Sequence, residues 1–177
     1  LAAINVDNNA LEFIPPFSTE DTPRLTTMFS YNNKIQKIPD SLWHHTGVVE
    51  MDLESNFIRE IPRYIERMES LGFLNLMDNR VSSIPPSLFK LTMLNTLQLD
   101  RNNITHIPIE ILNRKDHGFE YLTLAGNHIA ELPERFFEFK ARNLDLRNNS
   151  LKVLPKWTSE SAIGDHFFLA GNPVCWN

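Results

Sequence analysis

Three carboxylates alternate with apolar residues in one short stretch, Glu50-Met51-Asp52-Leu53-Glu54. Paired carboxyl groups are the catalytic machinery of most glycosidases, so an acid/base pair is the first chemistry to consider. That chemistry needs two groups that face each other across a cleft, with the scissile bond between them. Neighbours on one open strand do not supply that arrangement. The trio therefore predicts an acidic surface patch.

Metal and nucleophile chemistry find little support in the remaining polar residues. The sequence has one cysteine, Cys175, and six histidines that fall at different phases of the periodicity described below. No C-x-x-C, H-E-x-x-H or G-x-x-x-x-G-K-[ST] signature is present. We therefore expect no catalytic residue, no metal and no cofactor. The adjacent pair His44-His45 is interpreted as a solvated turn.

The elements that position these residues are set by a repeating asparagine. It recurs at intervals of 22 to 25 residues, at Asn9, Asn33, Asn56, Asn79, Asn102, Asn127, Asn149 and Asn172. Leucines precede it at fixed offsets, most clearly in Leu71-x-x-Leu74-x-Leu76-x-x-Asn79-x-Val81. The alternating leucines predict a short strand in each unit. A proline follows the asparagine in the first seven units, from Pro15 to Pro155, and marks a bend where no sheet donor is needed.

This pattern resembles the leucine-rich-repeat family, of the type with about 23 residues per repeat, over essentially the whole chain. The resemblance implies an α/β solenoid, a horseshoe with short parallel strands on its concave face and helical or irregular turns on its convex face. It also implies that each repeated asparagine lies inside and bonds the backbone of neighbouring turns. Trp43, Phe136, Phe137 and Trp157 fall in the outer segments and are predicted to pack in the outer core.

We expect residues 1–177 to form a single domain of about eight repeats, cut from a longer chain. Ser30 stands where other repeats place a core leucine, which predicts a locally weak layer. Residues 163–177 depart from the leucine pattern and are expected to be an atypical C-terminal capping repeat. Within them, Gly171-Asn172-Pro173-Val174-Cys175 resembles the closing segment of plant and oomycete receptor-like repeat proteins.

Composition narrows the function further. Apolar residues make up 42% and charged residues 22% of the chain, as in an ordinary folded domain. The net charge of −5 disfavours a nucleic-acid partner, since phosphate binding needs a basic face. No apolar run approaches the ~20 residues that span a bilayer, and we expect no secretory h-region in the first residues of this sequence.

Residues between the strand leucines should point away from the core and form the ligand face. Large apolar groups gather there, namely Phe29, Tyr31, Phe73, Met77, Tyr121 and Phe168. Together with Glu50, Asp52 and Glu54 they predict an aromatic binding platform with an acidic border. The alternative is that such exposed aromatics are scattered and need no partner.

Two N-x-[ST] sequons make Asn103 and Asn148 candidate glycosylation sites. The repeat itself generates this motif easily, so the sequons carry weight only if the protein is secreted. In that setting Cys175 should be oxidised, in a disulfide with a cysteine further along the natural protein.

The leading hypothesis is a non-catalytic protein- or peptide-binding module. It would be the ligand-recognition ectodomain of a receptor-like signalling protein at the cell surface, with any transmembrane anchor outside this segment. An intracellular, cytoplasmic scaffold for signalling proteins is the first alternative. A structural or adhesive extracellular protein is the second. Flanking sequence would discriminate among them, since a leader or a membrane anchor favours the receptor.

Overall fold

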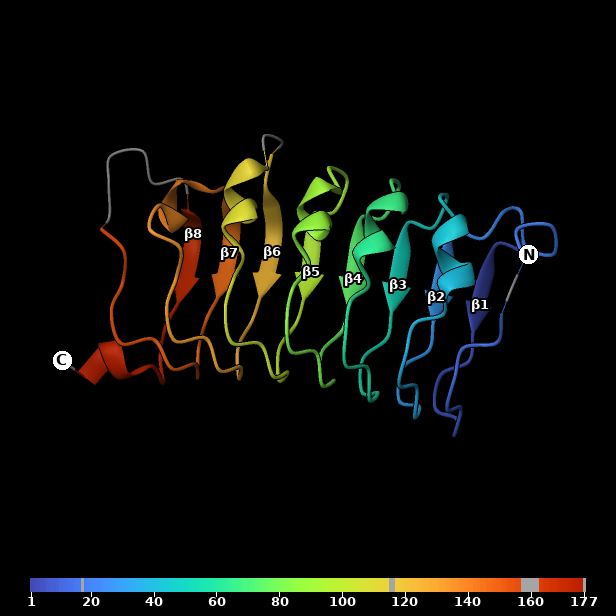
Figure 1. The fold of residues 1–177 in the computed structure, drawn as a ribbon, viewed down its shortest axis with the longest axis horizontal. Coiled ribbons are helices and arrows are strands. Elements are labelled where there is room, and N and C mark those ends of the chain that lie inside the picture. Colours follow the sequence, from blue (N-terminus) through green and yellow to red (C-terminus); the bar gives the residue numbers. More distant parts are fainter. Residues whose placement is uncertain (17, 115–116, 157–162, 177) are drawn as a thin grey trace.

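The computed structural model describes residues 1–16, 18–114, 117–156 and 163–176. In this part of the chain, eight short strands form one parallel sheet in sequence order, so that the two termini lie at opposite ends (Figure 1). The strands are β1 (Ala3–Asn5), β2 (Thr27–Phe29), β3 (Glu50–Asp52), β4 (Phe73–Asn75), β5 (Thr96–Gln98), β6 (Phe119–Thr123), β7 (Ala141–Asp145) and β8 (Ile163–Phe168).

Short 3-10 helices cover one side of this sheet (Figure 1). They are η1 (Asp40–His44), η2 (Arg63–Arg67), η3 (Pro86–Lys90), η4 (Ile109–Asn113) and η5 (Phe136–Glu138), while η6 (Pro173–Trp176) lies at the C-terminal end of the solenoid. The repeated proline precedes the first four of them as an extended residue, for example Pro62 with φ −65° and ψ 147°. Proline fixes φ near this value and has no main-chain N–H to donate. It therefore suits the bend between the loop after each strand and the 3-10 helix that follows. The predicted helical turns on the outer side are confirmed.

Consecutive strands pair without a shift from β1 to β6. Met28, Met51, Leu74, Leu97 and Leu122 therefore form one continuous row. All five are at most 1% exposed, and they pack with the helix residues into a single core. The strand positions predicted from the leucine pattern are confirmed. A buried apolar side chain in each of these strands gives neighbouring turns a common register.

The repeated asparagine links each turn to the one before it. The Asn102 side-chain amide donates to the main-chain oxygens of Leu76, Leu99 and Asp100, and its oxygen accepts the N–H of Val81. Equivalent bonds occur at the other buried members of the series, Asn33, Asn56, Asn79, Asn127, Asn149 and Asn172. The predicted role of this residue is confirmed, because a short side chain with both donor and acceptor satisfies backbone groups that the turn leaves unpaired.

The residue just before each repeated asparagine adopts a left-handed conformation. Non-glycine examples include Asp78 and Arg101, both with φ 53°, while Gly126 and Gly171 occupy the same place in later turns. This conformation reverses the chain at the end of the strand, which aims the asparagine inward. Polar residues that tolerate it share the position with glycine.

The aromatic residues predicted to pack in the outer core are buried wherever the structure describes them. Trp43 is 1% exposed, Phe136 0% and Phe137 2%. Trp157 lies outside the described residues. Ser30 occupies the leucine position as predicted and is completely buried, and its hydroxyl has no hydrogen-bond partner in the described structure. The second turn therefore carries an unsatisfied polar group in its core.

The interpretation of His44-His45 as a solvated turn is wrong for His45, although His44 is exposed. The His45 side chain is 4% exposed, and its Nε2 lies 2.8 Å from the Thr22 hydroxyl. Thr22 donates its own proton to the main-chain oxygen of Ser18, so Nε2–H of His45 is the donor to Thr22. A contact across 23 residues thus pins the irregular loop before β2.

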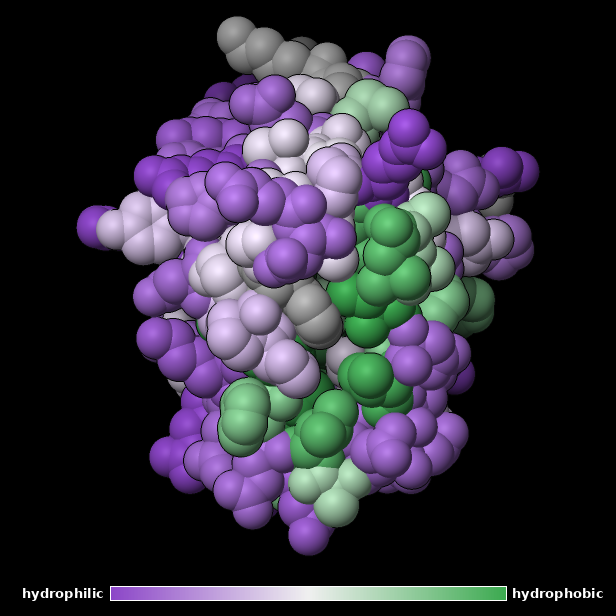
Figure 2. Space-filling view, turned by 90° about the vertical axis from the view of Figure 1, so that its right-hand side faces the viewer, coloured by the Kyte–Doolittle hydropathy of each residue, from purple (hydrophilic) through white to green (hydrophobic). Residues whose placement is uncertain are grey.

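Figure 2 looks onto the N-terminal end of the solenoid, where apolar groups gather between polar flanks. In the first turn, Leu1 and Phe13 are the most exposed large apolar residues, at 69% and 67%, while Ile4 and Ile14 are nearly buried. Among the described residues, no helix is long and apolar enough to cross a membrane.

Candidate ligand-binding face

The face of the sheet opposite the 3-10 helices, here called the sheet face, carries rows of side chains in register. One row runs through Glu50, Phe73, Thr96 and Tyr121 on β3 to β6. Phe73 and Tyr121 are thus two strands apart, and their Cα atoms are about 10 Å apart at normal strand spacing. Glu50 directly flanks Phe73. The phase of these residues in the sequence predicts this neighbourhood, and the register reproduces it.

The apolar residues predicted for this face differ in exposure. Tyr31, Tyr121 and Phe168 are 37%, 46% and 43% exposed. Phe29, Phe73 and Met77 are half-buried against their neighbours. A half-buried aromatic near an exposed one can anchor a ligand with little further loss of side-chain conformational entropy, because its ring is already held in place. Phe73 and Tyr121 form such a pair.

Phe168 belongs to a separate cluster at the C-terminal end of the sheet. The Arg147 guanidinium lies 5.3 Å from its ring centre, and the His166 ring stacks on it at 6.0 Å. Arg147 is in turn held by a two-pronged ion pair with Asp145. Because Arg147 and His166 already contact the Phe168 ring, we do not group Phe168 with the central pair of Phe73 and Tyr121.

Several acidic and amide side chains on the sheet face serve the backbone. Asp52 accepts the N–H of Glu54 two residues on, and Asn75 and Asp145 do the same for Met77 and Arg147. The same bond joins Asp7 to Asn5 in the first turn. This geometry is an Asx turn, which ends β1, β3, β4 and β7. Its sequence signal is an Asn or Asp four residues before the repeated asparagine, a position that the leucine pattern alone does not draw attention to.

A second arrangement serves the turns after β2 and β6, which lack that residue. The preceding turn then supplies an aspartate: Asp7 accepts the N–H of Tyr31 at 2.7 Å, and Asp100 accepts that of Ala125 at 2.8 Å. Thr123 also donates its hydroxyl to Asp100. Burial raises the pKa of Asp100 against these two bonds, and the nearby Asp145 adds to the rise. Asp100 therefore stabilises the fold, and its buried carboxylate is little exposed to a ligand.

The predicted acidic trio divides into distinct roles. Asp52 is engaged in its Asx turn, and burial raises its pKa. Glu54 accepts a hydrogen bond from the side-chain amide of Asn75 at 2.9 Å. Glu50 has no hydrogen-bond or ion-pair partner in the described structure. Of the three, Glu50 is the carboxylate most available to a cationic ligand group.

The residues predicted for modification lie on the surface. Asn103 is exposed on the turn after β5. Asn148 is also exposed, in the left-handed position, and its side-chain oxygen packs against Gly171. The Cys175 thiol is exposed in η6 and contacts the main-chain oxygen of Leu169 at 3.2 Å.

Among the described residues, no three His, Cys, Asp or Glu side chains are grouped so that they could hold a metal ion. His45 lines a cavity of about 530 Å³ together with Thr22, Thr26 and His44, beside the start of β2 and β3.

Solved structures share this architecture, although no protein-family model and no curated protein matches the sequence. A leucine-rich-repeat protein of Leptospira interrogans superposes with a TM-score of 0.86 at 28% identity, over 98% of this chain and 44% of that one. A plant ice-binding protein gives 0.79 at 22% identity, over 96% of this chain and 56% of that one.

A receptor ectodomain is also among the similar folds. The Arabidopsis receptor kinase HAESA, solved with the peptide hormone IDA and a co-receptor, superposes with a TM-score of 0.78 at 23% identity. That match covers 97% of this chain and 30% of HAESA, so the chain spans less than two thirds of each of the three. The eight-stranded parallel sheet, the asparagine ladder (the buried asparagines of the repeat, from Asn33 to Asn172) and these likenesses give the chain an α/β solenoid fold of the leucine-rich-repeat type.

Proposed function

We propose that this chain is a non-catalytic binding module whose sheet face recognises a protein or peptide with an apolar anchor and a basic flank. The observation that carries the proposal is the registered row of Glu50, Phe73, Thr96 and Tyr121. Phe73 and Tyr121 would hold the apolar group between them over Thr96. Met77 lies two residues after the end of β4, which carries Phe73, and its flexible thioether can repack around the anchor.

Charge supports the polarity of the proposed ligand. Glu50 has no hydrogen-bond or ion-pair partner in the described structure, and the Glu54 carboxylate accepts a hydrogen bond from the neutral amide of Asn75. A cation on the ligand would therefore meet an available carboxylate one strand away from the Phe73 ring. Such a charged border increases the association rate and selects among partners more than it adds affinity. Phe29 on β2 and Tyr31 just after it extend the face.

Extracellular recognition is the setting we propose for this activity, as part of a receptor-like, glycosylated signalling protein. The exposure of Asn103, Asn148 and Cys175 is compatible with that setting, and HAESA, whose fold is similar, was solved with a peptide hormone. In this proposal residues 163–177 act as the C-terminal cap of a single repeat domain within a longer natural protein. A cytoplasmic scaffold with the same face is the second candidate, since the fold is not confined to receptors, as the plant ice-binding protein shows.

A selection experiment tests the proposal while the natural partner is still unidentified. A displayed library of random 12-residue peptides would be selected on the folded chain and again on the E50K variant. We expect wild-type binders to combine a Phe, Trp or Leu anchor with Lys or Arg nearby, and selection on E50K to lose that basic bias. Binders with no shared composition, or an unchanged basic bias on E50K, would refute the sheet-face site.

A further inference from the structure

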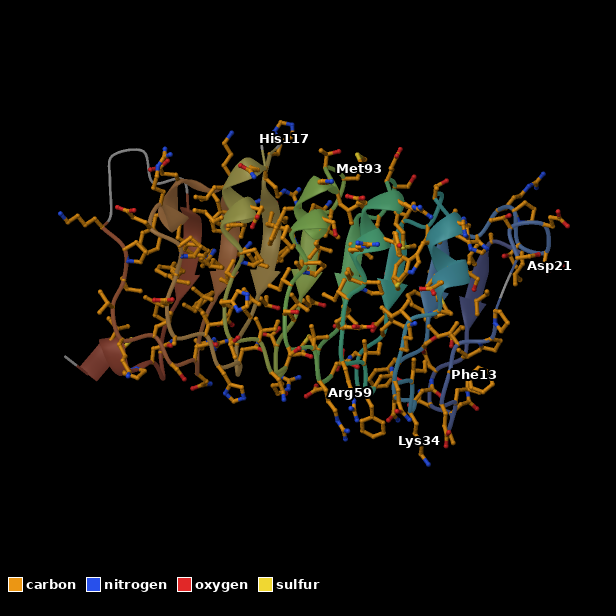
Figure 3. All side chains as sticks on the ribbon, in the orientation of Figure 1. Phe13, Asp21, Lys34, Arg59, Met93 and His117 are labelled. Carbon is orange, nitrogen blue, oxygen red and sulfur yellow. The ribbon has the colours of Figure 1, made fainter. Side chains whose placement is uncertain are left out.

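A second charged surface lies where the strands end, on the turns that follow β2, β3 and β4. Lys34, Lys37, Arg59 and Arg80 are all exposed there and are called the basic edge below. Figure 3 shows Lys34 and Arg59 along this edge of the solenoid, together with Phe13. Four cations on three consecutive turns stand out in a chain with a net charge of −5.

The cations of the basic edge differ from the ion-paired cations elsewhere in the solenoid. Lys90 pairs with Glu66, Arg101 with Asp78, Arg135 with Glu138, Arg142 with Glu120 and Arg147 with Asp145. Within the described ranges, none of the four basic-edge side chains forms an ion pair. No neighbouring carboxylate neutralises their charge there, so it is available to a partner.

Backbone bonds between turns give the edge a fixed spacing. The N–H of Lys34 donates to Leu11, that of Phe57 to Ile35 and that of Arg80 to Ile58, each at 2.8 Å. Lys34, Phe57 and Arg80 thus occupy one row. The Cα atoms of Lys34 and Arg80 are about 10 Å apart at normal strand spacing. The Arg80 guanidinium lies 4.4 Å from the Phe57 ring centre, and this cation–π contact holds it along the row.

We propose that the basic edge binds an acidic peptide segment of a partner protein, independently of the sheet face. Phe57 is 38% exposed and supplies an apolar contact between cations, which suits a segment that mixes carboxylates with apolar side chains. Glu60 stands beside this row on the turn after β3. A uniformly charged sulfated polysaccharide would meet a like charge there, whereas a peptide can place a neutral residue opposite it.

A fluorescently labelled probe peptide of 12 residues, alternating Glu with neutral residues and carrying one Phe, tests the proposal on the 177-residue chain. The K34E/R80E variant should weaken binding at least tenfold in low salt, and the difference should narrow as added salt screens the charges. The matched control is K152E, which reverses an exposed cation at the same repeat phase as Arg59 but four turns away, and it should change binding less than twofold. Circular dichroism confirms that each variant is folded.

The outcomes separate this proposal from its rivals. The F73A and Y121A variants should bind the acidic probe as the wild type does, since they alter the sheet face alone. Equal binding by wild type and K34E/R80E, or no binding by the wild type, overturns the proposal. Displacement of the peptide by a sulfated hexasaccharide at a lower concentration also overturns it, because the edge would then be a polysaccharide site.

Discussion

The side-chain amide of Asn79 donates a 2.9 Å hydrogen bond to the main-chain oxygen of Leu53 in the preceding turn. The Asn79 oxygen also accepts the N–H of Ile58, so one side chain closes backbone groups on two segments. These groups are buried, and water cannot replace the asparagine without entering the core. The asparagine ladder is therefore required for one turn of the solenoid to stack on the next.

Substitution of the ladder tests that requirement. We expect N79A and N102A each to lower the free energy of unfolding by ~1–3 kcal/mol, because buried backbone groups lose their partners. The adjacent N103A is the matched control: Asn103 is exposed, and its loss should cost less than ~0.5 kcal/mol. Urea denaturation of the three variants gives the comparison. Equal stability of N79A and N103A would show that the ladder contributes nothing to the fold.

The buried hydroxyl of Ser30 gives a prediction of opposite sign. It has no partner in the described structure and sits in the position that Leu53 and Leu76 fill in the next turns. The S30A variant should therefore raise the free energy of unfolding by about 1 kcal/mol, since an unsatisfied buried group is removed. The exposed S82A serves as the control, and thermal unfolding compares the two. A fall in stability for S30A would mean that the hydroxyl is satisfied in solution.

Asp100 predicts a pH dependence. Burial is the main reason that its pKa is raised in the folded chain, so the folded state binds a proton more readily than the unfolded one. Its contribution is then most favourable at acidic pH and is lost as the pH rises through the folded pKa. The D100N variant retains an oxygen for Ala125 and removes the charge. It should melt above wild type at pH 7, and the difference should shrink as the pH approaches the ordinary range of aspartate. A difference in Tm that stays constant with pH would contradict this assignment.

Cys175 reports on the compartment of the natural protein. If the chain is an extracellular segment, the thiol should be oxidised there, in a disulfide with a cysteine beyond this sequence. Mass mapping of the intact, unreduced natural protein identifies the partner directly. A free thiol would instead favour the cytoplasmic scaffold, and the exposure of Cys175 makes its alkylation a simple first readout.

The features that the sequence predicts are those encoded within one repeat. The leucine spacing locates Leu74 and Leu97 in the core, and the phase of Asn79 predicts its inward orientation, because each depends on local geometry that every turn repeats. The sequence does not predict the burial of His45, because its partner, Thr22, belongs to the irregular loop before β2, where no repeat phase applies.

Charge on the surface is harder to predict than the core. The alternation of Glu50, Asp52 and Glu54 correctly indicates their common face, yet it does not reveal that Asp52 accepts the main-chain N–H of Glu54. That bond depends on the turn conformation after the strand, which becomes visible only once Asx positions are aligned across repeats.

In the proposed function, ligand recognition on the sheet face depends above all on Phe73 and Tyr121. The most direct measurement is the affinity, by titration calorimetry, of one peptide selected on the wild-type chain for F73A, Y121A and the control Y64A. Tyr64 is 38% exposed on η2, at the other side of the solenoid, and so matches Tyr121 in type and closely in exposure. We expect F73A and Y121A each to cost ~2 kcal/mol or more, roughly 30-fold in Kd, with Y64A within twofold of wild type and all three chains folded. Wild-type affinity in both F73A and Y121A would contradict the proposed function and place the binding site elsewhere on the solenoid.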